Sequence, residues 1–191
     1  MKTRHSGSSS DGLVFHKVDK ARWDDFAALF ESPGAPKYCW CMAWRASGTE
    51  ARDMKNPERK AAMHERVKAG VPVGILGYQG GEPVAWCSIA PRATYRPLGG
   101  LEQDGEAEED VWSLACFFLK RSVRGQGLGR QTLEAAVAHA RAEGARVVEA
   151  YPVDADSPSY RFMGFVSEFR KAGFREVGRA GSRRHVMRLE V

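Results

Sequence analysis

Three glycines at alternate positions form the most specific chemical signal in the chain, within the segment Arg124-Gly125-Gln126-Gly127-Leu128-Gly129. Because glycine lacks a Cβ, successive backbone N–H groups of such a segment can turn toward one point, and this geometry binds phosphate. Lys120, Arg121, Arg124 and Arg130 surround the segment with no acidic residue between them. Since the dipole of a following helix adds partial positive charge, the segment predicts a site for a pyrophosphate group.

The spacing of the glycines separates this segment from two other phosphate-binding loops. A dinucleotide-binding loop has the pattern G-x-G-x-x-G, and a nucleoside-triphosphate loop has Gly-Lys followed by Ser or Thr. The segment has neither pattern. On the glycines alone, a tight turn or a left-handed helix cap remains an equally good explanation.

The residues on either side of the glycine segment predict a strand, a loop and a helix. The apolar run from Val111 to Lys120 is short enough to be a buried central strand. After the glycines, apolar residues recur at helical spacing as far as Gly144, which ends the helix: Leu133, Ala136, Val137 and Ala140. A following strand at 146–153 would lie parallel to the first, because the helix carries the chain back to the edge where it began.

The rest of the chain predicts further helices and strands on both sides of this unit. Before the unit come a strand at 13–18, a helix with Trp23, Phe26, Ala27 and Phe30 on one face, a helix from Asn56 to about Lys68, and a hairpin of strands 73–79 and 84–89. After it come a helix that begins at Ser157 and Pro158 and strands near 174–179 and 184–191. The inner face of that last helix carries Phe162, Phe165, Val166 and Phe169. Segment 97–110 is expected to be a solvated acidic loop. This order predicts an α/β fold with a mixed sheet, in a single domain over residues 13–191. Residues 1–12 are rich in Ser and Gly and are expected to be a disordered tail or an expression remnant.

Composition excludes several classes of protein. The chain has 191 residues, 43% of them hydrophobic and 28% charged, which fits a globular domain and neither a disordered nor a fibrous protein. No apolar run reaches the roughly 20 residues that span a bilayer. Because no apolar segment follows Lys2 and Arg4 as in a secretory signal, a cytoplasmic protein without membrane attachment is expected.

Four cysteines raise the question of a metal site. Cys39 and Cys41 are spaced C-x-C, whereas Cys87 and Cys116 occur singly within strand runs. A structural zinc site requires four well-placed ligands, and the five histidines show no ligand spacing. We therefore expect no metal, no disulfide, and buried thiols that pack as small hydrophobic groups.

Two motifs give the chain a resemblance to the GNAT superfamily of N-acetyltransferases. Residues Arg124 to Gly129 match the family's R/Q-x-x-G-x-G/A loop, between a strand and a helix, and Lys171-Ala172-Gly173-Phe174 resembles the K-x-G-F element that closes its last helix. The resemblance covers about residues 13–191. It implies a V-splayed mixed sheet of about six to seven strands flanked by about four helices, with acetyl-CoA bound in the opening.

The resemblance also implies which residues hold acetyl-CoA. The backbone of Phe117, Phe118 and Leu119 would pair with the pantetheine amides as an added strand does, while their side chains pack in the core. The pyrophosphate would lie on the glycine segment and its flanking arginines, which are Arg124, Gly125, Gln126, Gly127, Leu128, Gly129 and Arg130.

The proton-transfer groups are less well defined, because the chain departs from the family's pattern. Phe169 stands where relatives have a tyrosine acid, so Tyr160 or a water molecule is the candidate replacement. For the base, the candidates are Glu109 and Asp110 at the start of the central strand, with Ser113 as the holder of a water molecule. The alternative for both acids is a role as solvated charges of the acidic loop. Glu149 is a further option as base, or one partner of a surface ion pair.

The resemblance implies that the segment between the first two predicted helices, which is rich in aromatic residues, forms the acceptor wall. Trp40 and Trp44, together with Trp86 and Trp112, would line a pocket for an apolar or cationic amine, with core packing as the alternative for at least half of them. Arg45 would hold a substrate carboxylate or pair with the acidic segment.

Together these observations predict an N-acetyltransferase that uses acetyl-CoA to acetylate a primary amine of a small molecule, by direct attack in a ternary complex. One alternative is a protein that binds nucleic acid, such as transfer RNA, because residues 170–188 carry seven bases and one acid, Glu176. For that class Phe174 would be the exposed ring. Another alternative is an acyl-CoA sensor without turnover, because the tyrosine is missing. A homodimer is left open.

Overall fold

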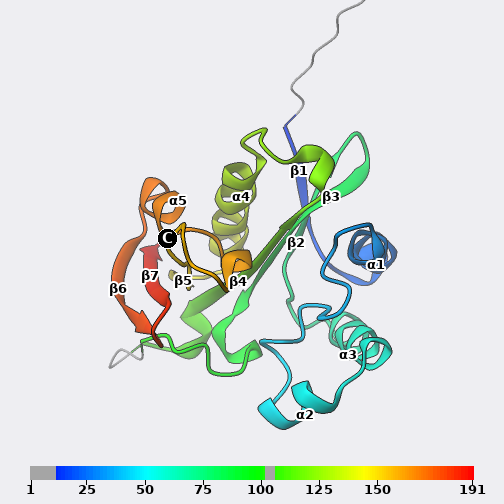
Figure 1. Ribbon diagram of the computed structural model, residues 1–191, viewed down its shortest axis with the longest axis horizontal. Coiled ribbons are helices and arrows are strands. Elements are labelled where there is room, and N and C mark those ends of the chain that lie inside the picture. Colours follow the sequence, from blue (N-terminus) through cyan, green and yellow to red (C-terminus); the bar gives the residue numbers. More distant parts are fainter. Residues whose placement is uncertain (1–11, 102–105) are drawn as a thin grey trace, which may run out of the picture.

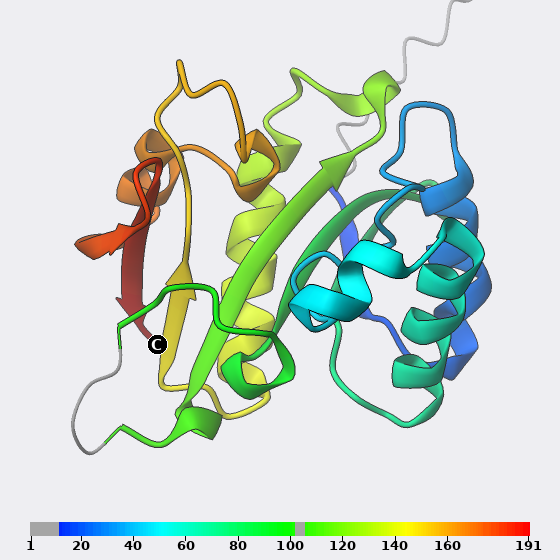
Figure 2. The ribbon, with the colours of Figure 1, turned by 60° about the horizontal axis from the view of Figure 1, so that its bottom comes forward.

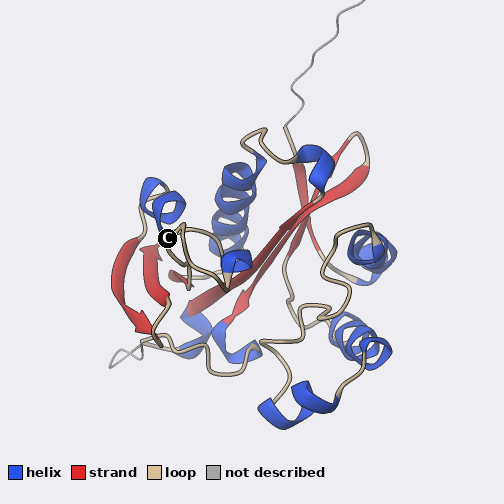
Figure 3. Cartoon of the chain, in the orientation of Figure 1, coloured by secondary structure: helices blue, strands red, loops and turns tan. Residues whose placement is uncertain are grey.

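A seven-stranded mixed sheet organises the chain, with strand order β1-β2-β3-β4-β5-β7-β6 (Figures 1 and 3). The computed structural model describes residues 12–101 and 106–191. The strands are β1 (Val14–Lys17), β2 (Ile75–Gln79), β3 (Glu82–Pro91), β4 (Val111–Leu119), β5 (Val147–Ala150), β6 (Arg175–Ala180) and β7 (Arg184–Glu190). The central strand β4 pairs parallel to β5 and antiparallel to β3, as the sequence predicts.

The sheet opens beside β4. β4 pairs with β5 over four residues, from Val111 to Leu114, whereas its pairing with β3 continues to Leu119. The register with β3 shifts so that Ser88 faces Cys116 and Ile89 faces Leu114, which leaves Ala115 as the extra residue of a β-bulge. Beyond this bulge β4 diverges from the chain that follows β5 (Figure 2). The predicted V-splayed sheet is confirmed.

Helices cover both faces of the sheet. They are α1 (Trp23–Glu31), α2 (Gly48–Asp53), α3 (Asn56–Lys68), α4 (Leu128–Ala142) and α5 (Val166–Lys171). α1 and α3 pack on one face, and α4 and α5 on the other (Figure 1). Each face has its own hydrophobic cluster because successive residues of a strand point to opposite sides, so that Trp86 contacts the α1 layer and Cys87 the α4 layer.

The region before α5 differs from the predicted continuous helix. Residues Arg161–Met163 form a single 3-10 turn, Gly164 follows with φ +87°, and Phe165 forms a β-bridge with Val153. A Cβ on Gly164 would lie 2.7 Å from the ring of Phe169, so this backbone conformation needs glycine. The break leaves α5 with six residues.

Other expectations need smaller corrections. The sequence did not predict α2, and β5 is shorter than the predicted 146–153. Glu106 is not solvated, because it is mostly buried beside Arg188 and Arg92. The predicted N-terminal tail lies outside the described residues except for Gly12. Among the helices that the structure describes, none has the length and hydropathy to cross a membrane.

Candidate active site

A cavity of about 610 Å³ lies at the opening of the sheet. The C-terminal half of β4 forms one wall, and two loops form the others, one between α1 and α2 and one between β5 and α5. The lining residues are Gly34, Ala35, Pro36, Tyr38, Cys39, Cys41, Ala43, Trp44, Cys116, Phe117, Phe118, Leu119, Arg124, Arg161, Phe162 and Phe165. Among the described residues, no carboxylate or imidazole lines it.

One edge of β4 is free along this cavity. Because β5 leaves β4 after Leu114, the edge from Cys116 to Leu119 that would face β5 has no strand partner in the described chain. The side chains of this segment pack on both faces of the sheet. The Phe117 ring lies 6.1 Å from that of Phe169, measured between centroids, and Phe118 belongs to the hydrophobic cluster that includes α1. The backbone of this edge is therefore positioned to pair with an extended ligand.

The glycine segment lies at the N-terminus of α4, just beyond β4. Gly125 and Gly127 have φ values of +79° and +74°, and Gly127 is the residue before the first helical turn. Within the part of the chain that the structure describes, the backbone N–H groups of residues 125–129 donate no hydrogen bond. A Cβ at any of the three glycines would meet open space. Five donors that have no acceptor among the described residues thus lie together at a helix N-terminus, an arrangement that can bind an anion.

The basic residues around the segment are not equivalent. Arg124 donates from Nε to the carbonyl oxygen of Leu119 at 3.0 Å and lines the cavity. Arg130 instead pairs with Glu134 at 2.8 Å on the exposed face of α4. We therefore expect Arg124 to contribute more than Arg130 to holding an anion.

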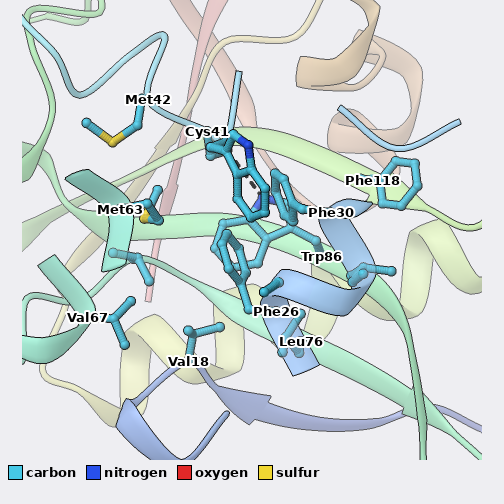
Figure 4. Packing of buried hydrophobic residues seen from close by; sticks show 14 of the residues in the cluster. Val18, Phe26, Phe30, Cys41, Met42, Met63, Val67, Leu76, Trp86 and Phe118 are labelled. Atoms are coloured by element: carbon cyan, nitrogen blue, oxygen red, sulfur yellow. Dashed lines mark hydrogen bonds between the residues drawn. The ribbon is translucent and has the colours of Figure 1, made fainter. Parts of the chain in front are cut away.

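Three cysteines lie on the cavity wall, which the sequence did not predict. Trp86 donates from Nε1 to the Sγ of Cys41 at 3.3 Å (Figure 4), and the N–H of Cys41 donates to the Sγ of Cys39 at 3.4 Å. Trp40 and Cys41 both have positive φ, +47° and +55°, a conformation that is rare outside glycine. The C-x-C spacing was the available signal, and its interpretation as plain core packing was incomplete.

The environment of Cys41 favours its thiolate. A hydrogen bond from Cys116 lowers the pKa of Cys41 to about 6, against the opposing effect of burial, and Arg45 adds to the lowering. Burial instead raises the pKa of Cys39 to about 12. The cavity thus holds one thiol that ionises near neutral pH beside thiols that do not.

Alkylation tests this difference. We expect iodoacetamide to modify Cys41 with a rate that rises with pH through a midpoint near 6, because the thiolate is the nucleophile. Replacing Cys116 with Ala removes the hydrogen-bond donor and should move the midpoint upward, whereas Cys87→Ala should not. The site of modification is measured by peptide mass spectrometry. A midpoint above 8 in the unmodified protein would contradict the prediction.

Of the predicted aromatic wall, Trp44 alone lines the cavity. Trp40 and Trp86 belong to the buried cluster under α1, where Phe26 and Phe30 surround Trp86 at centroid distances of 4.9 and 5.8 Å (Figure 4). Trp112 lies on the opposite face of the sheet against His139. The assignment of these three residues to the acceptor pocket is wrong, because their rings fill the two cores.

Arg45 is a structural residue and neither of its predicted roles is correct. It is 5% exposed and donates to the Oγ of Ser88 at 2.9 Å, the carbonyl oxygen of Val73 at 2.8 Å and the hydroxyl of Tyr95 at 3.0 Å. No carboxylate contacts it among the described residues. The guanidinium group instead joins the α1–α2 loop to β3.

The predicted base candidates do not reach the cavity. Asp110 pairs with Arg146 at 3.5 Å, and Glu109 is exposed beside it. Six residues of strand, at about 3.3 Å each, place Asp110 roughly 20 Å from Cys116. Both residues therefore fit their alternative role as surface charges.

Ser113 and Glu149 form one buried network with Tyr151. The Tyr151 hydroxyl bonds to Ser113 at 3.1 Å and donates to Glu149 at 2.5 Å. Glu149 has no exposed surface and pairs with Arg188 at 2.7 Å, so its ion pair is buried and not a surface pair. Tyr160 is closer to the cavity, because its ring packs 6.2 Å from that of Trp44.

Solved structures share this fold. The GNAT domain of S. lividans PAT is 17% identical with a TM-score of 0.60, and the alignment covers 94% of this chain and 90% of that one. YncA, a putative acetyltransferase from Salmonella typhimurium with its cofactor acetyl-CoA, is 16% identical with a TM-score of 0.53, covering 94% of both chains. PaiA N-acetyltransferase from Thermoplasma acidophilum in complex with coenzyme A is 12% identical with a TM-score of 0.55, covering 95% and 100%. No curated protein gives a significant match.

The model of the acetyltransferase (GNAT) family matches residues 20–165, which include the first helix, the central strand and the glycine segment. The chain belongs to the GNAT family of acetyltransferases, so the predicted resemblance is confirmed.

Proposed function

We propose that this chain transfers an acetyl group from acetyl-CoA to a primary amine of a small molecule, by direct attack in a ternary complex. One observation carries the proposal: within the described residues, the unpaired edge of β4 leads along the cavity to five backbone N–H groups that have no acceptor. This path has the polar groups that an extended pantetheine arm and a pyrophosphate require. The structures of YncA and PaiA with acetyl-CoA and coenzyme A support it.

Each part of the donor would have its own contacts. The backbone of Phe117 to Leu119 would pair with the pantetheine amides, and residues 125–129 with Arg124 would hold the pyrophosphate. Acetyl-CoA supplies a thioester, whose acetyl carbon the neutral amine attacks as the coenzyme A thiol leaves. Since an ordinary thiol has a pKa near 8.5, the leaving group needs little help from an acid, which makes Phe169 compatible with turnover. Tyr160 stays the candidate proton donor.

A small acceptor fits the cavity better than a lysine-bearing peptide. Its walls are apolar and aromatic, and among the described residues it presents no carboxylate to attract a basic peptide.

The four cysteines are free, which supports a reducing compartment and hence the cytoplasm.

The basic C-terminal region offers little support for nucleic-acid binding. Several of its cations have carboxylate partners: Arg170 pairs with Glu176, Lys171 with Glu168 and Arg188 with Glu149. Phe174, the predicted exposed ring, is buried at 3% exposure. Residues 170–188 therefore lack the exposed ring expected of such a surface, and three of their seven cations are already paired with carboxylates.

Calorimetry and thiol release test the proposal. We expect acetyl-CoA to bind with one site per chain, to raise the melting temperature by mass action, and to release thiol when a suitable amine is added. Binding without thiol release across a broad amine panel would favour the sensor. An absence of both binding and thermal protection at millimolar acetyl-CoA would refute the proposal.

A further inference from the structure

Two arginines stack on Trp44, the tryptophan of the cavity wall. The guanidinium carbon of Arg96 lies 4.6 Å from the Trp44 ring centroid, and that of Arg184 lies 4.8 Å from it. Arg184 also lies 5.3 Å from the ring of Tyr160. We call Arg96, Trp44 and Arg184 the arginine–tryptophan cluster. Its guanidinium planes are held by aromatic contacts, which leaves their N–H edges available for hydrogen bonds.

The cluster carries positive charge without a compensating acid. Neither arginine forms an ion pair within residues 12–101 and 106–191, whereas the nearby Arg92 and Arg188 share Glu106. Both cluster arginines are half-buried. Burial, together with the neighbouring charge of Arg96, lowers the pKa of Arg184 from its usual value. Two half-buried cations side by side are unfavourable unless an anion joins them.

Hydrogen-bond donors in the cluster are also unused. The Nε of Arg96 and the Nε1 of Trp44 are buried and have no acceptor among the residues that the structure describes. Arg184 uses Nη1 to donate to the carbonyl oxygen of Leu98 at 2.8 Å. Buried polar groups are normally satisfied, so two orphan donors beside two unpaired cations indicate a missing acceptor with negative charge.

The position of the cluster separates it from the donor site. Arg96 follows β3, whose last residue, Pro91, faces Trp112 near the start of β4, whereas the glycine segment follows the end of β4. Of the three residues of the cluster, Trp44 lines the cavity itself, and Arg96 and Arg184 adjoin it through their contacts with the Trp44 ring. The cluster therefore borders the part of the cavity that is remote from the pyrophosphate site.

We propose that the arginine–tryptophan cluster binds a carboxylate of the acceptor, so that the substrate is a small primary amine that also carries a carboxylate, as amino acids do. This inference rests on the proposed acetyl transfer. The guanidinium edges supply paired N–H donors to the two carboxylate oxygens, and the aromatic rings hold those edges in place. Anchoring the carboxylate here leaves the amine of the same molecule in the cavity beside β4.

Matched acceptors test the proposal. We would compare L-amino acids with their carboxamides, which keep the amine and the side chain but lose the negative charge, by thiol release at saturating acetyl-CoA. We expect a preference of at least ~10-fold in kcat/KM for the carboxylates that react, in line with the strength of hydrogen bonds to charged groups.

Matched variants locate the effect. Arg96→Gln and Arg184→Gln should each raise KM for the carboxylate acceptor by ~10-fold or more, with kcat and the affinity for acetyl-CoA little changed and the carboxamide unaffected. Arg183→Gln is the control, because Arg183 is exposed and donates to the Oγ of Ser159. It removes the same charge one residue away and should leave KM unchanged. Melting curves identify a variant that fails to fold. If Arg184→Gln does not fold, the measurement on Arg96→Gln decides the test.

The outcomes separate this inference from the proposed function. If acetyl-CoA does not bind, the proposed function fails. If acetyl-CoA binds and carboxamides react as well as carboxylates, or if the Arg96 and Arg184 variants leave KM unchanged, the carboxylate site is wrong while acetyl transfer stands. The inference is also overturned if no amino acid reacts and none raises the melting temperature of the coenzyme A complex more than the corresponding carboxamide does.

Discussion

The double substitution Gly125→Ala/Gly127→Ala is expected to lower the affinity for coenzyme A by ~100-fold or more while the chain stays folded. The pyrophosphate would accept hydrogen bonds from several of the N–H groups of residues 125–129. Each hydrogen bond to a charged group contributes about 1.5–3 kcal/mol. Both glycines have φ values that alanine adopts at a cost of roughly 1–2 kcal/mol. When the loop relaxes to relieve that strain, its N–H groups turn away from the pyrophosphate position. The new methyl groups also occupy space that the pyrophosphate would fill.

A second double substitution provides a matched control for conformational strain. Gly70 and Gly144 follow the ends of α3 and α4, have φ values of +75° and +98°, and would also meet open space with a Cβ. Gly70→Ala/Gly144→Ala should therefore reduce the free energy of unfolding by a similar amount and leave coenzyme A binding intact. Isothermal titration and urea unfolding measure the two quantities. Equal affinities in both double variants would remove the glycine segment from the donor site.

The substitution Glu149→Leu is expected to destabilise the fold by about 3–5 kcal/mol, the usual cost of leaving a buried charge without its partner. Glu149 has no exposed surface and accepts from Arg188 at 2.7 Å, Tyr151 at 2.5 Å and the N–H of Leu101 at 3.3 Å. Its loss leaves Arg188, 7% exposed, with Glu106 as its remaining carboxylate. Urea unfolding measures the change in free energy.

Two further variants identify the cause of that loss. Adding Arg188→Met to Glu149→Leu removes the buried guanidinium group that has lost its partner Glu149, and should restore part of the stability because replacing both partners costs less than removing one. Glu134→Leu breaks the exposed pair with Arg130, and should change stability by less than about 1 kcal/mol. If Glu149→Leu is as mild as Glu134→Leu, the buried network does not stabilise the fold.

Local sequence patterns predict much of the fold. Trp23, Phe26, Ala27 and Phe30 have helical spacing and are all buried in α1, and Gly80 and Gly81 form the predicted hairpin turn between β2 and β3. The glycine segment was predicted with its strand before it and its helix after it. These features depend on periodicity and on backbone conformations that one residue type adopts, both of which are readable from a single sequence.

The acceptor side was predicted poorly because it depends on contacts between distant segments. Alternation along β3 decides that Trp86 faces α1, and the pairing register places Trp112 on the other face. Composition cannot distinguish an aromatic residue in a pocket from one in a core. Arg45 shows the same limitation, since its partners Val73, Ser88 and Tyr95 lie 28 or more residues away.

The free edge of β4 has a consequence for how this enzyme diverges. If the donor pairs with main-chain groups as proposed, it is indifferent to the side chains along the strand, so we expect residues 117–119 to tolerate other apolar types while donor binding is retained, with proline as the exception. The loop between α1 and α2 contributes side chains to the opposite wall. Under the proposed assignment, we expect mutations in this loop to alter acceptor preference without loss of the acetyl donor, so that selection or engineering can change the two walls of the cavity independently.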